Sequence, residues 1–251
     1  MLQQTQVSRV LSKYDEFLRV FPTVRALATA PTGRILRAWQ GLGYNRRAIL
    51  LQKAARAVMS DFGGRFPRTR DGLESLPGVG QSTAGAIMAF AFGLPTVFIE
   101  TNIRSVFLHF FFAGRRSVHD RDILPLIERT LPKNTGRIGR RAGRGERSRL
   151  DIRQWYYALM DYGVHLKQTM PNPSRRSAHH ARQSPFKGSN RQVRAEILRF
   201  ILSVGARGRT TAAITRHIAI TMGPTPHDIR ANIAALAREG FIRETARGWR
   251  A

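Results

Sequence analysis

Two features about twenty residues apart in the first half of the chain have residue types suited to chemistry: a glycine turn and an isolated carboxylate. The turn, Pro-Gly-Val-Gly at 77–80, joins two stretches with helical patterning, and the carboxylate, Glu100, ends an apolar run. Gly78 and Gly80 permit backbone angles closed to other residues and let a ligand approach the main chain closely. The N–H groups that open the second helix would face outward, an arrangement that binds phosphate.

Each feature also has a simpler interpretation. The turn could form a helix–hairpin–helix that holds a DNA phosphate without reading sequence, or an ordinary corner between two helices. Glu100 could act on a reacting centre. It could equally be an exposed acid, or the N-cap partner of the helix expected for NIRSVFLHFFF at 102–112. Taken alone, these residues leave the two interpretations of the turn and the three of Glu100 open.

The composition of the chain favours a polyanionic partner. Its 251 residues include 42 lysines and arginines against 16 aspartates and glutamates, a net charge of +26. DNA, RNA and an anionic membrane surface are the candidates. A membrane is the weakest of them, since the longest apolar run, residues 84–99, is shorter than the roughly 20 residues that a spanning helix needs. We therefore expect residues 84–99 to form a buried helix, and we expect no membrane association.

The absence of cysteine and of a signal peptide limits the cofactors and the cellular location that we expect. The sequence has no cysteine, which excludes disulfides, zinc–cysteine sites and iron–sulfur clusters. The first residues lack the apolar stretch of a signal peptide, so we expect a cytoplasmic, nucleoid-associated protein.

Apolar residues recur at helical spacing through residues 1–180, where no alternation with a period of two appears. This pattern predicts an all-α main body, with helices over 3–20, 32–40 and 49–62 before the glycine turn. Residues 136–149 hold six arginines and four glycines, a composition typical of a flexible basic loop.

The last third of the chain is organised differently. Residues 171–190 are rich in turn-forming types and are expected to form a linker or an extended wrap. Helical periodicity then predicts three short helices over 191–204, 211–221 and 226–239, followed by FIRETARGWR, which alternates like a small hairpin. Three helices and a two-stranded wing predict a winged-helix-like DNA-binding domain over 191–251.

The longer motif LPGVGQSTAGAI…FAFG…ETNIR resembles the helix–hairpin–helix DNA glycosylases, the superfamily of endonuclease III and the A/G-specific adenine glycosylases. The adenine glycosylase branch is favoured by further matching stretches, namely MLQQTQV at 1–7, FPTVRALATA at 21–30, GLGYNRRA at 41–48, GGRFP at 63–67 and ALMDYG at 158–163. The resemblance implies a two-lobed, all-α helix–hairpin–helix glycosylase domain over residues 1–170. The stretch 171–190 would stand in place of the family's iron–sulfur loop, before the small winged-helix-like domain.

The resemblance implies contacts with DNA at several places. The hairpin would grip a phosphate through backbone amides, and Gln3 and Gln4 would enter the base stack beside a flipped base. Tyr44 and Asn45 lie in the loop that carries a second wedge, and TNIR at 101–104 would follow the DNA backbone. The residues expected to bind DNA are Gln3, Gln4, Tyr44, Asn45, Arg46, Arg47, Leu76, Gly78, Val79, Gly80, Thr83, Asn102 and Arg104.

The resemblance also implies the catalytic groups. Glu100 stands where the family has an aspartate that stabilises the cationic sugar formed as the N-glycosidic bond breaks. Ser82 stands where bifunctional members carry a nucleophilic lysine. A serine cannot form a Schiff base, so the resemblance implies a monofunctional enzyme with water as the nucleophile. Ser82 is also a plausible helix-start residue on its own account.

Other positions depart from the family. Tyr157 stands where adenine glycosylases have the glutamine or glutamate that reads adenine, and with Asp161 it is expected to line the base pocket. The family's general acid lies two residues before the methionine that is Met1 here. LKQTMPNPSRRSAHHARQS replaces the segment with the cluster cysteines, and its pair His179–His180 is expected to be basic or structural rather than metal-binding. No cofactor and no metal are expected.

The predicted function is therefore that of a monofunctional DNA glycosylase acting on mismatched or damaged duplex DNA, as a monomer. Adenine opposite guanine or 8-oxoguanine is the first expected substrate, and thymine or uracil opposite guanine is the second. A non-catalytic binder of DNA lesions or structures is the alternative from another class. A transcription regulator, suggested by the C-terminal helices, is disfavoured by the resemblance over residues 1–170.

Overall fold

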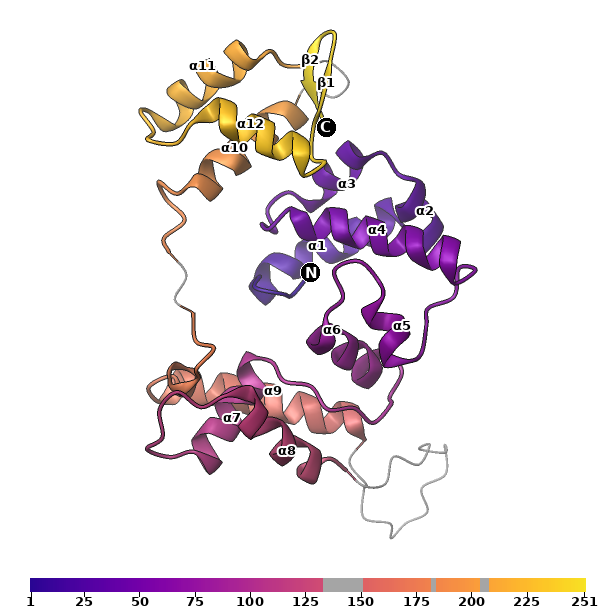
Figure 1. Ribbon diagram of the computed structural model, residues 1–251, viewed down its shortest axis with the longest axis vertical. Coiled ribbons are helices and arrows are strands. Elements are labelled where there is room, and N and C mark those ends of the chain that lie inside the picture. The colour runs from indigo at the N-terminus through magenta and orange to yellow at the C-terminus, as the bar shows by residue number, and fades with distance from the viewer. Residues whose placement is uncertain (133–150, 182–183, 204–207) are drawn as a thin grey trace. The chain divides into compact units, whose positions relative to one another are not determined.

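The computed structural model describes residues 1–132, 151–181, 184–203 and 208–251 (Figure 1). The predicted basic loop, 136–149, lies outside these residues. The first helices are α1 Val7–Val20, α2 Val24–Thr29, α3 Thr32–Trp39, α4 Arg46–Asp61, α5 Arg70–Glu74 and α6 Gln81–Ala86, which continues into a π-helix, η1 Ile87–Ala91. The later elements are α7 Thr101–Phe111, α8 Asp120–Thr130, α9 Ile152–Thr169, the 3₁₀-helix η2 Pro173–Arg176, α10 Asn190–Leu202, α11 Thr211–Met222, α12 Ile229–Arg238, β1 Arg243–Thr245 and β2 Gly248–Arg250.

The predicted all-α class is confirmed, with the short β1–β2 hairpin as the sheet of the described residues. The three helices and the hairpin expected after residue 190 are present as α10, α11, α12, β1 and β2. Among the helices of the described ranges, none is both long and apolar enough to cross a bilayer.

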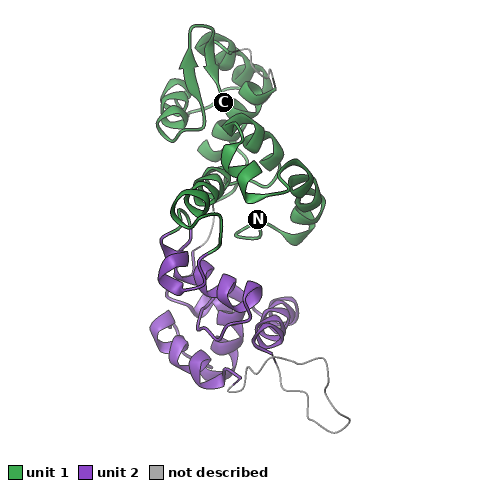
Figure 2. Ribbon diagram, turned by 90° about the vertical axis from the view of Figure 1, so that its right-hand side faces the viewer, with its two compact units in different colours: residues 1–66, 76–78, 183–251 green, residues 67–75, 79–182 purple. Residues whose placement is uncertain are grey.

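The chain forms two compact units (Figure 2). Unit 1 consists of residues 1–66, 76–78 and 183–251, and unit 2 consists of residues 67–75 and 79–182. The hairpin of the sequence motif contributes to both, because Leu76–Gly78 belong to unit 1 and Val79 opens the longer segment of unit 2.

Unit 1 has one apolar core to which both ends of the chain contribute. Ile35 and Trp39 of α3 belong to the same buried cluster as Ile197 and Ile201 of α10. Ala251 closes this core from the C-terminal side, since a Cβ on Gly33 would fall 3.0 Å from the Ala251 carbonyl oxygen. Residues 191–251 are therefore packed on the helices of residues 1–66 through a shared core.

Unit 2 has its own core, centred on α7 and α9. The two helices come closest at Gly163, where a Cβ would fall 2.3 Å from the carbonyl oxygen of Asn102. Tyr156 is fully buried beside Phe98 and donates its hydroxyl to the carbonyl of Thr96, 2.7 Å away. Glycine at 163 is therefore what allows α9 to lie against the first turn of α7.

The apolar run before Glu100 differs from the buried helix expected of it. Helix is retained through η1, which ends at Ala91, and residues 94–100 then form no helix. Gly93 adopts a φ of +65°, which favours glycine, and Pro95 has no backbone N–H to continue a helix. Glu100 thus follows a non-helical segment of about seven residues.

Candidate DNA-binding and catalytic site

The glycine hairpin has the local geometry that its sequence predicts. Thr69 caps α5, and Gly80 is the N-cap residue of α6. Gly78 adopts a φ of +82°, and a Cβ there would fall 2.8 Å from the Cβ of Leu50. The turn therefore requires glycine at 78 both for its backbone angle and for the space beside α4.

Ser82 connects the hairpin to the segment that leads to Glu100. Its hydroxyl donates a hydrogen bond of 2.7 Å to the carbonyl oxygen of Ile99, the residue directly before the carboxylate. Ser82 lies in the first turn of α6 but does not cap that helix, since Gly80 is the N-cap and α6 has no side-chain cap. The side chain serves to place two parts of unit 2 beside each other.

Glu100 is the N-cap residue of α7. Its Oε1 accepts hydrogen bonds from the backbone N–H groups of Asn102, at 2.6 Å, and Ile103, at 2.8 Å. The first turn of a helix favours a negative charge, because its unpaired N–H groups and its dipole point toward that end. Both donors use the same oxygen, so Oε2 is not part of the cap. The N-cap interpretation of Glu100 is thus correct in geometry, and it is compatible with a catalytic carboxylate.

Lys167 of α9 approaches the same turn, although the sequence motifs did not single it out. Its ammonium donates to Oδ1 of Asn102 at 2.6 Å. Burial lowers the pKa of Lys167 below its ordinary value, and the negative charge of Glu100 opposes that shift. Asn102, predicted to face DNA, therefore connects α9 to the residue that caps α7.

The other predicted DNA contact on α7 is already paired. Arg104 forms a two-point ion pair with Asp120, with Nε–Oδ1 and Nη2–Oδ2 distances of 2.7 Å. Both side chains are largely shielded from solvent. A phosphate contact by Arg104 stays a prediction, and it would have to share a guanidinium that Asp120 holds.

Tyr157 and Asp161 are expected to line a base pocket. Both are exposed, and they lie one turn apart on the same face of α9. The ring of Tyr157 stacks on Phe90 of η1 with centroids 4.8 Å apart. This arrangement presents an aromatic face and a hydroxyl to solvent, so Tyr157 is available for stacking or for a single hydrogen bond to a base.

The site residues predicted near the N-terminus all belong to unit 1 and are gathered around Arg47. Its Nη1 donates to the carbonyls of Met1 and Gln3, and its Nη2 donates to the hydroxyl of Thr5. Nη2 also donates to the carbonyls of two residues in the neighbouring loop, Leu42 and Gly43. Arg47 therefore joins residues 1–5 to loop 41–45.

Those two loops contain strained residues. Gln4, predicted to enter the base stack, has a φ of 55°, and Tyr44, in the loop predicted to carry a second wedge, has a φ of 48°. Positive φ at a residue with a side chain is uncommon and persists where surrounding contacts enforce it. The guanidinium of Arg47, which also lies over the rings of Trp39 and Tyr44, supplies such contacts. Asn45 and Arg46 follow in the same loop and at the start of α4, where Arg46 is exposed.

The segment expected to replace the iron–sulfur loop, residues 171–190, is held to α7 by hydrogen bonds. Arg176 donates to the carbonyls of Leu108 and Phe112 at 2.8 Å, and the hydroxyls of Ser174 and Ser105 lie 2.6 Å apart. Within the described residues, no group of three or more His, Cys, Asp or Glu side chains could hold a metal ion. Polar contacts thus hold residues 174–176 against α7.

The all-helical fold, the glycine hairpin and the carboxylate that caps α7 define a helix–hairpin–helix protein of the DNA-repair class. Residues 1–132, more than half of the chain, match the family model described as HhH-GPD superfamily base excision DNA repair protein. The chain belongs to the HhH-GPD superfamily.

The relatives that the chain resembles include adenine DNA glycosylases. It is 40% identical over 111 residues to that of Buchnera aphidicola, 44% over 107 residues to that of Homo sapiens and 42% over 106 residues to that of Mycobacterium tuberculosis. These matches cover 42–44% of this chain but 20–35% of the relatives, so the chain spans about a third or less of their length. Among solved structures, a thermostable thymine-DNA glycosylase superposes with a TM-score of 0.52 at 26% identity, covering 65% of this chain and 69% of the other.

Proposed function

We propose that the protein is a DNA N-glycosylase that hydrolyses the glycosidic bond of a mispaired or damaged base in duplex DNA and has no lyase activity. The observation that carries this proposal is the state of Glu100, whose Oε1 is fixed by two backbone N–H groups while Oε2 stays outside the cap. A fixed negative charge with one uncommitted oxygen is suited to stabilising a developing sugar cation. Membership of a base excision repair superfamily supports this chemistry.

Hydrolysis would follow from the serine at position 82. Its hydroxyl is occupied by the carbonyl of Ile99, and a hydroxyl cannot form the iminium that a lysine forms with the sugar. Lys167 is the nearby amine of α9, but its hydrogen bond to Asn102 gives it a positioning role. Water is then the nucleophile, the glycosidic bond breaks, and the departing base takes a proton.

Adenine opposite guanine or 8-oxoguanine is the substrate that the adenine glycosylase relatives support. Thymine opposite guanine is the second candidate, because the chain superposes on a thymine-DNA glycosylase and because Tyr157 offers one hydroxyl rather than a two-point amide. The protein would act as a monomer on duplex DNA, without a metal or cluster, at the nucleoid.

The test is a single-turnover assay with duplexes carrying A·G, A·8-oxoG, T·G and U·G pairs, analysed with and without alkali. We expect strand breaks after alkali treatment, on one of these duplexes, and none without it. Breaks without alkali, or a protein–DNA adduct trapped by borohydride, would contradict the hydrolytic assignment. Inactivity on all four duplexes, together with tight binding to one, would favour the non-catalytic lesion binder.

A further inference from the structure

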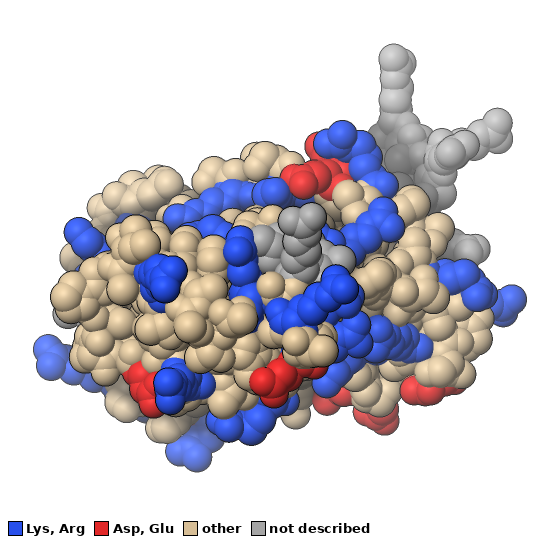
Figure 3. Space-filling model, turned by 90° about the horizontal axis from the view of Figure 1, so that it is seen from above, with Lys and Arg blue, Asp and Glu red and all other residues tan. Residues whose placement is uncertain are grey.

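The C-terminal module, from α10 to β2 (residues 190–250), has basic side chains that lie outside the candidate catalytic site described above. We define its module face as Arg230 and Arg238 on α12 and Arg243 and Arg247 on or between the strands, all of them exposed. Figure 3 shows the molecule from the side that is at the top of Figure 1, where α11, α12 and the hairpin are drawn. On that side the blue Lys and Arg side chains cover more of the surface than the red Asp and Glu side chains. An anionic partner is the one that such a surface attracts.

The carboxylates of the module do little to neutralise this face. The module has eleven arginines against four carboxylates. Glu196 accepts from His217 at 2.8 Å, and Glu239 pairs with Arg194 at 2.8 Å. Asp228 caps α12 by accepting from the N–H of Ala231. Three of the four acids therefore have partners inside the module, and the arginines of the module face keep their charge for a ligand.

The hairpin places like charges opposite each other. In its register Arg243 faces Arg250, a pairing that destabilises a two-stranded sheet unless an anion lies nearby. The Nε atoms of Arg250 and of Arg209, which pairs with Trp249 beside β2, are buried without a hydrogen-bond partner in the described structure. The guanidinium of Arg209 lies over the ring of Phe200, 4.3 Å from its centroid, so the exposed arginines of this hairpin, Arg243 and Arg247, are the ones that a phosphate backbone could contact.

The elements beneath the face have the arrangement of a helix–turn–helix. Residues 223–228 connect α11 to α12, and the β1–β2 hairpin follows. In such a motif the last helix enters the major groove of DNA. Between its two arginines, α12 presents alanines, which are small enough to let the helix backbone approach the groove.

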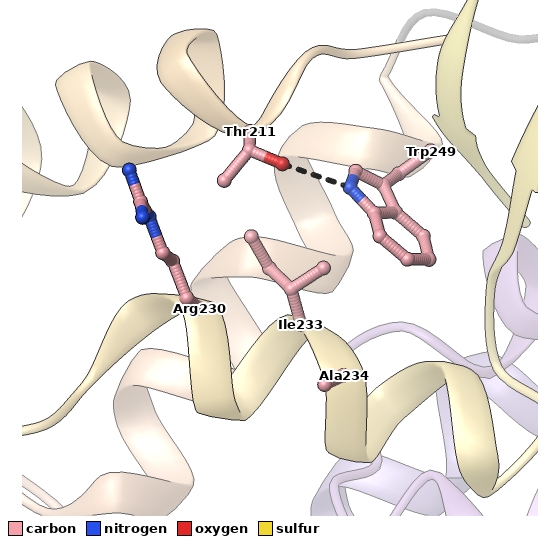
Figure 4. A pocket seen from close by; sticks show the side chains of 5 residues that line it. All are labelled: Thr211, Arg230, Ile233, Ala234 and Trp249. Atoms are coloured by element: carbon pink, nitrogen blue, oxygen red, sulfur yellow. Dashed lines mark hydrogen bonds between the residues drawn. The ribbon is translucent and has the colours of Figure 1, made fainter. Parts of the chain in front are cut away.

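A shallow pocket of about 330 Å³ lies where α12 meets the hairpin (Figure 4). Its lining residues are Thr211, Arg230, Ile233, Ala234 and Trp249. The indole N–H of Trp249 donates to the hydroxyl of Thr211 at 3.0 Å, which fixes the hairpin against the start of α11. The guanidinium of Arg230 extends beside this pocket from α12, so the face combines an exposed charge with a depression where α12 meets the hairpin.

We propose that the module face is a second DNA-binding surface, which binds the sugar–phosphate backbone of B-form duplex DNA with α12 at the major groove. It recognises the duplex and not the damaged base, and it raises the affinity of the whole chain for DNA. The proposal is independent of base excision, since it concerns binding to undamaged duplex.

The test uses the full chain and a fluorescein-labelled, undamaged 30-base-pair duplex, with binding followed by anisotropy at several salt concentrations. The double variant Arg230→Glu/Arg238→Glu is compared with Arg19→Glu/Arg25→Glu, which makes the same charge change on exposed residues of α1 and α2 in the same unit. We expect the first variant to bind at least about tenfold more weakly. The slope of log K against log salt should also fall by about 1.8, because each phosphate contact contributes about 0.9.

Equal weakening in the two variants would overturn the proposal, since net charge and not the module face would then explain the loss. Arg230→Gln/Arg238→Gln, checked for an unchanged melting temperature, removes charge more gently and should give a smaller loss in the same direction. A Glu100→Gln background separates this result from catalysis, because loss of excision there leaves the binding difference intact.

A duplex RNA of the same sequence tests the groove assignment. The major groove of A-form RNA is too deep and narrow to admit a helix. We expect the module-face substitutions to weaken DNA binding more than RNA binding. An equal effect on both duplexes would overturn docking of α12 in a groove.

Discussion

Glu100 in unit 2 and Arg47 in unit 1 are charged side chains held by backbone groups, but they differ in how completely they are used. Glu100 accepts from two N–H groups through one oxygen, while its second oxygen is outside the cap. Arg47 commits both terminal nitrogens to carbonyls and a hydroxyl of two loops. The carboxylate keeps one oxygen outside its cap, where it is available for chemistry, whereas the terminal nitrogens of Arg47 are all used to hold residues 1–5 and loop 41–45 and its Nε is buried.

The largest expected effect is on Glu100. Glu100→Gln keeps the size and the capping oxygen but removes the negative charge, so base excision should fall by at least about a hundredfold, the size of effect that a lost electrostatic stabiliser has. Single-turnover rates at saturating protein measure this, and duplex affinity should change little.

Glu100→Asp sharpens the same test, since it restores the residue that the resemblance to the glycosylases implies here. A rise in activity would indicate that the glutamate is poorly placed, and a fall would indicate that the backbone before α7 is fitted to the longer side chain. Equal rates for wild type, Gln and Asp forms would show that Glu100 is not catalytic.

The next effect concerns Arg47. Arg47→Lys keeps the charge, but a single ammonium cannot donate to the five oxygens that the guanidinium reaches in residues 1–5 and loop 41–45. We expect a loss of about 1–2 kcal/mol in unfolding free energy and weaker binding to mismatched duplex. Urea unfolding measures the first quantity.

Arg46→Lys is the matched control, because Arg46 is exposed and lies next to Arg47 at the start of α4. If Arg46→Lys destabilised the chain as much as Arg47→Lys, the guanidinium of Arg47 would not be the group that holds the two loops.

Local patterns predicted much of this arrangement. Helical periodicity predicted α1, α3, α4 and the three helices of the C-terminal module, with starts that differ by up to four residues. The positions of Gly78 and Glu100 were visible as a turn and a potential cap. The hydrogen bonds by which Arg47 joins residues 1–5 to loop 41–45 could not be predicted from local patterns, because Arg47 and Met1 are 46 positions apart in the sequence. Lys167 and Asn102 are 65 positions apart, and no local signal pairs them.

The apolar run before Glu100 was predicted incorrectly for a local reason. Its hydrophobicity suggested one buried helix, but Gly93 and Pro95 end the helix early, and both were visible in the sequence. The backbone preferences of these two residues outweighed the apolar composition of the run. The roles of the site residues toward DNA depend on a ligand and stay predictions.

A smaller effect is expected at Lys167, which fixes Asn102 and thereby the turn that Glu100 caps. Lys167→Met keeps most of the side-chain length and removes the hydrogen bond to Asn102. We expect excision to fall about fivefold, which corresponds to roughly 1 kcal/mol, the typical value of one hydrogen bond. An unchanged rate would mean that the cap of α7 does not depend on α9.

The pH dependence of stability tests the same residue. Because burial lowers the pKa of Lys167 in the folded protein, the unfolded chain binds a proton there more readily. The contribution of Lys167 to stability is therefore larger above its unfolded pKa, near 10.5, and falls as the pH decreases through the lowered folded value. Urea unfolding as the pH approaches 10.5 should show this rise in wild type and less of it in Lys167→Met.

Tyr156 extends the comparison to a neutral group, and here no effect on excision is expected. Its hydroxyl is buried and satisfied by the carbonyl of Thr96, and burial raises its pKa to about 12. A raised folded pKa means that the group supports stability fully below its unfolded pKa, near 10, and loses that contribution as the pH rises through about 12.

Tyr156→Phe should therefore lower stability by roughly 1 kcal/mol at neutral pH and remove the last tyrosine to ionise in an ultraviolet titration. If the latest-titrating tyrosine persisted in Tyr156→Phe, the buried hydroxyl would belong to another residue. If excision fell as it does for Glu100→Gln, a satisfied core group would be contributing to catalysis, and the distinction between satisfied and partly satisfied groups would fail.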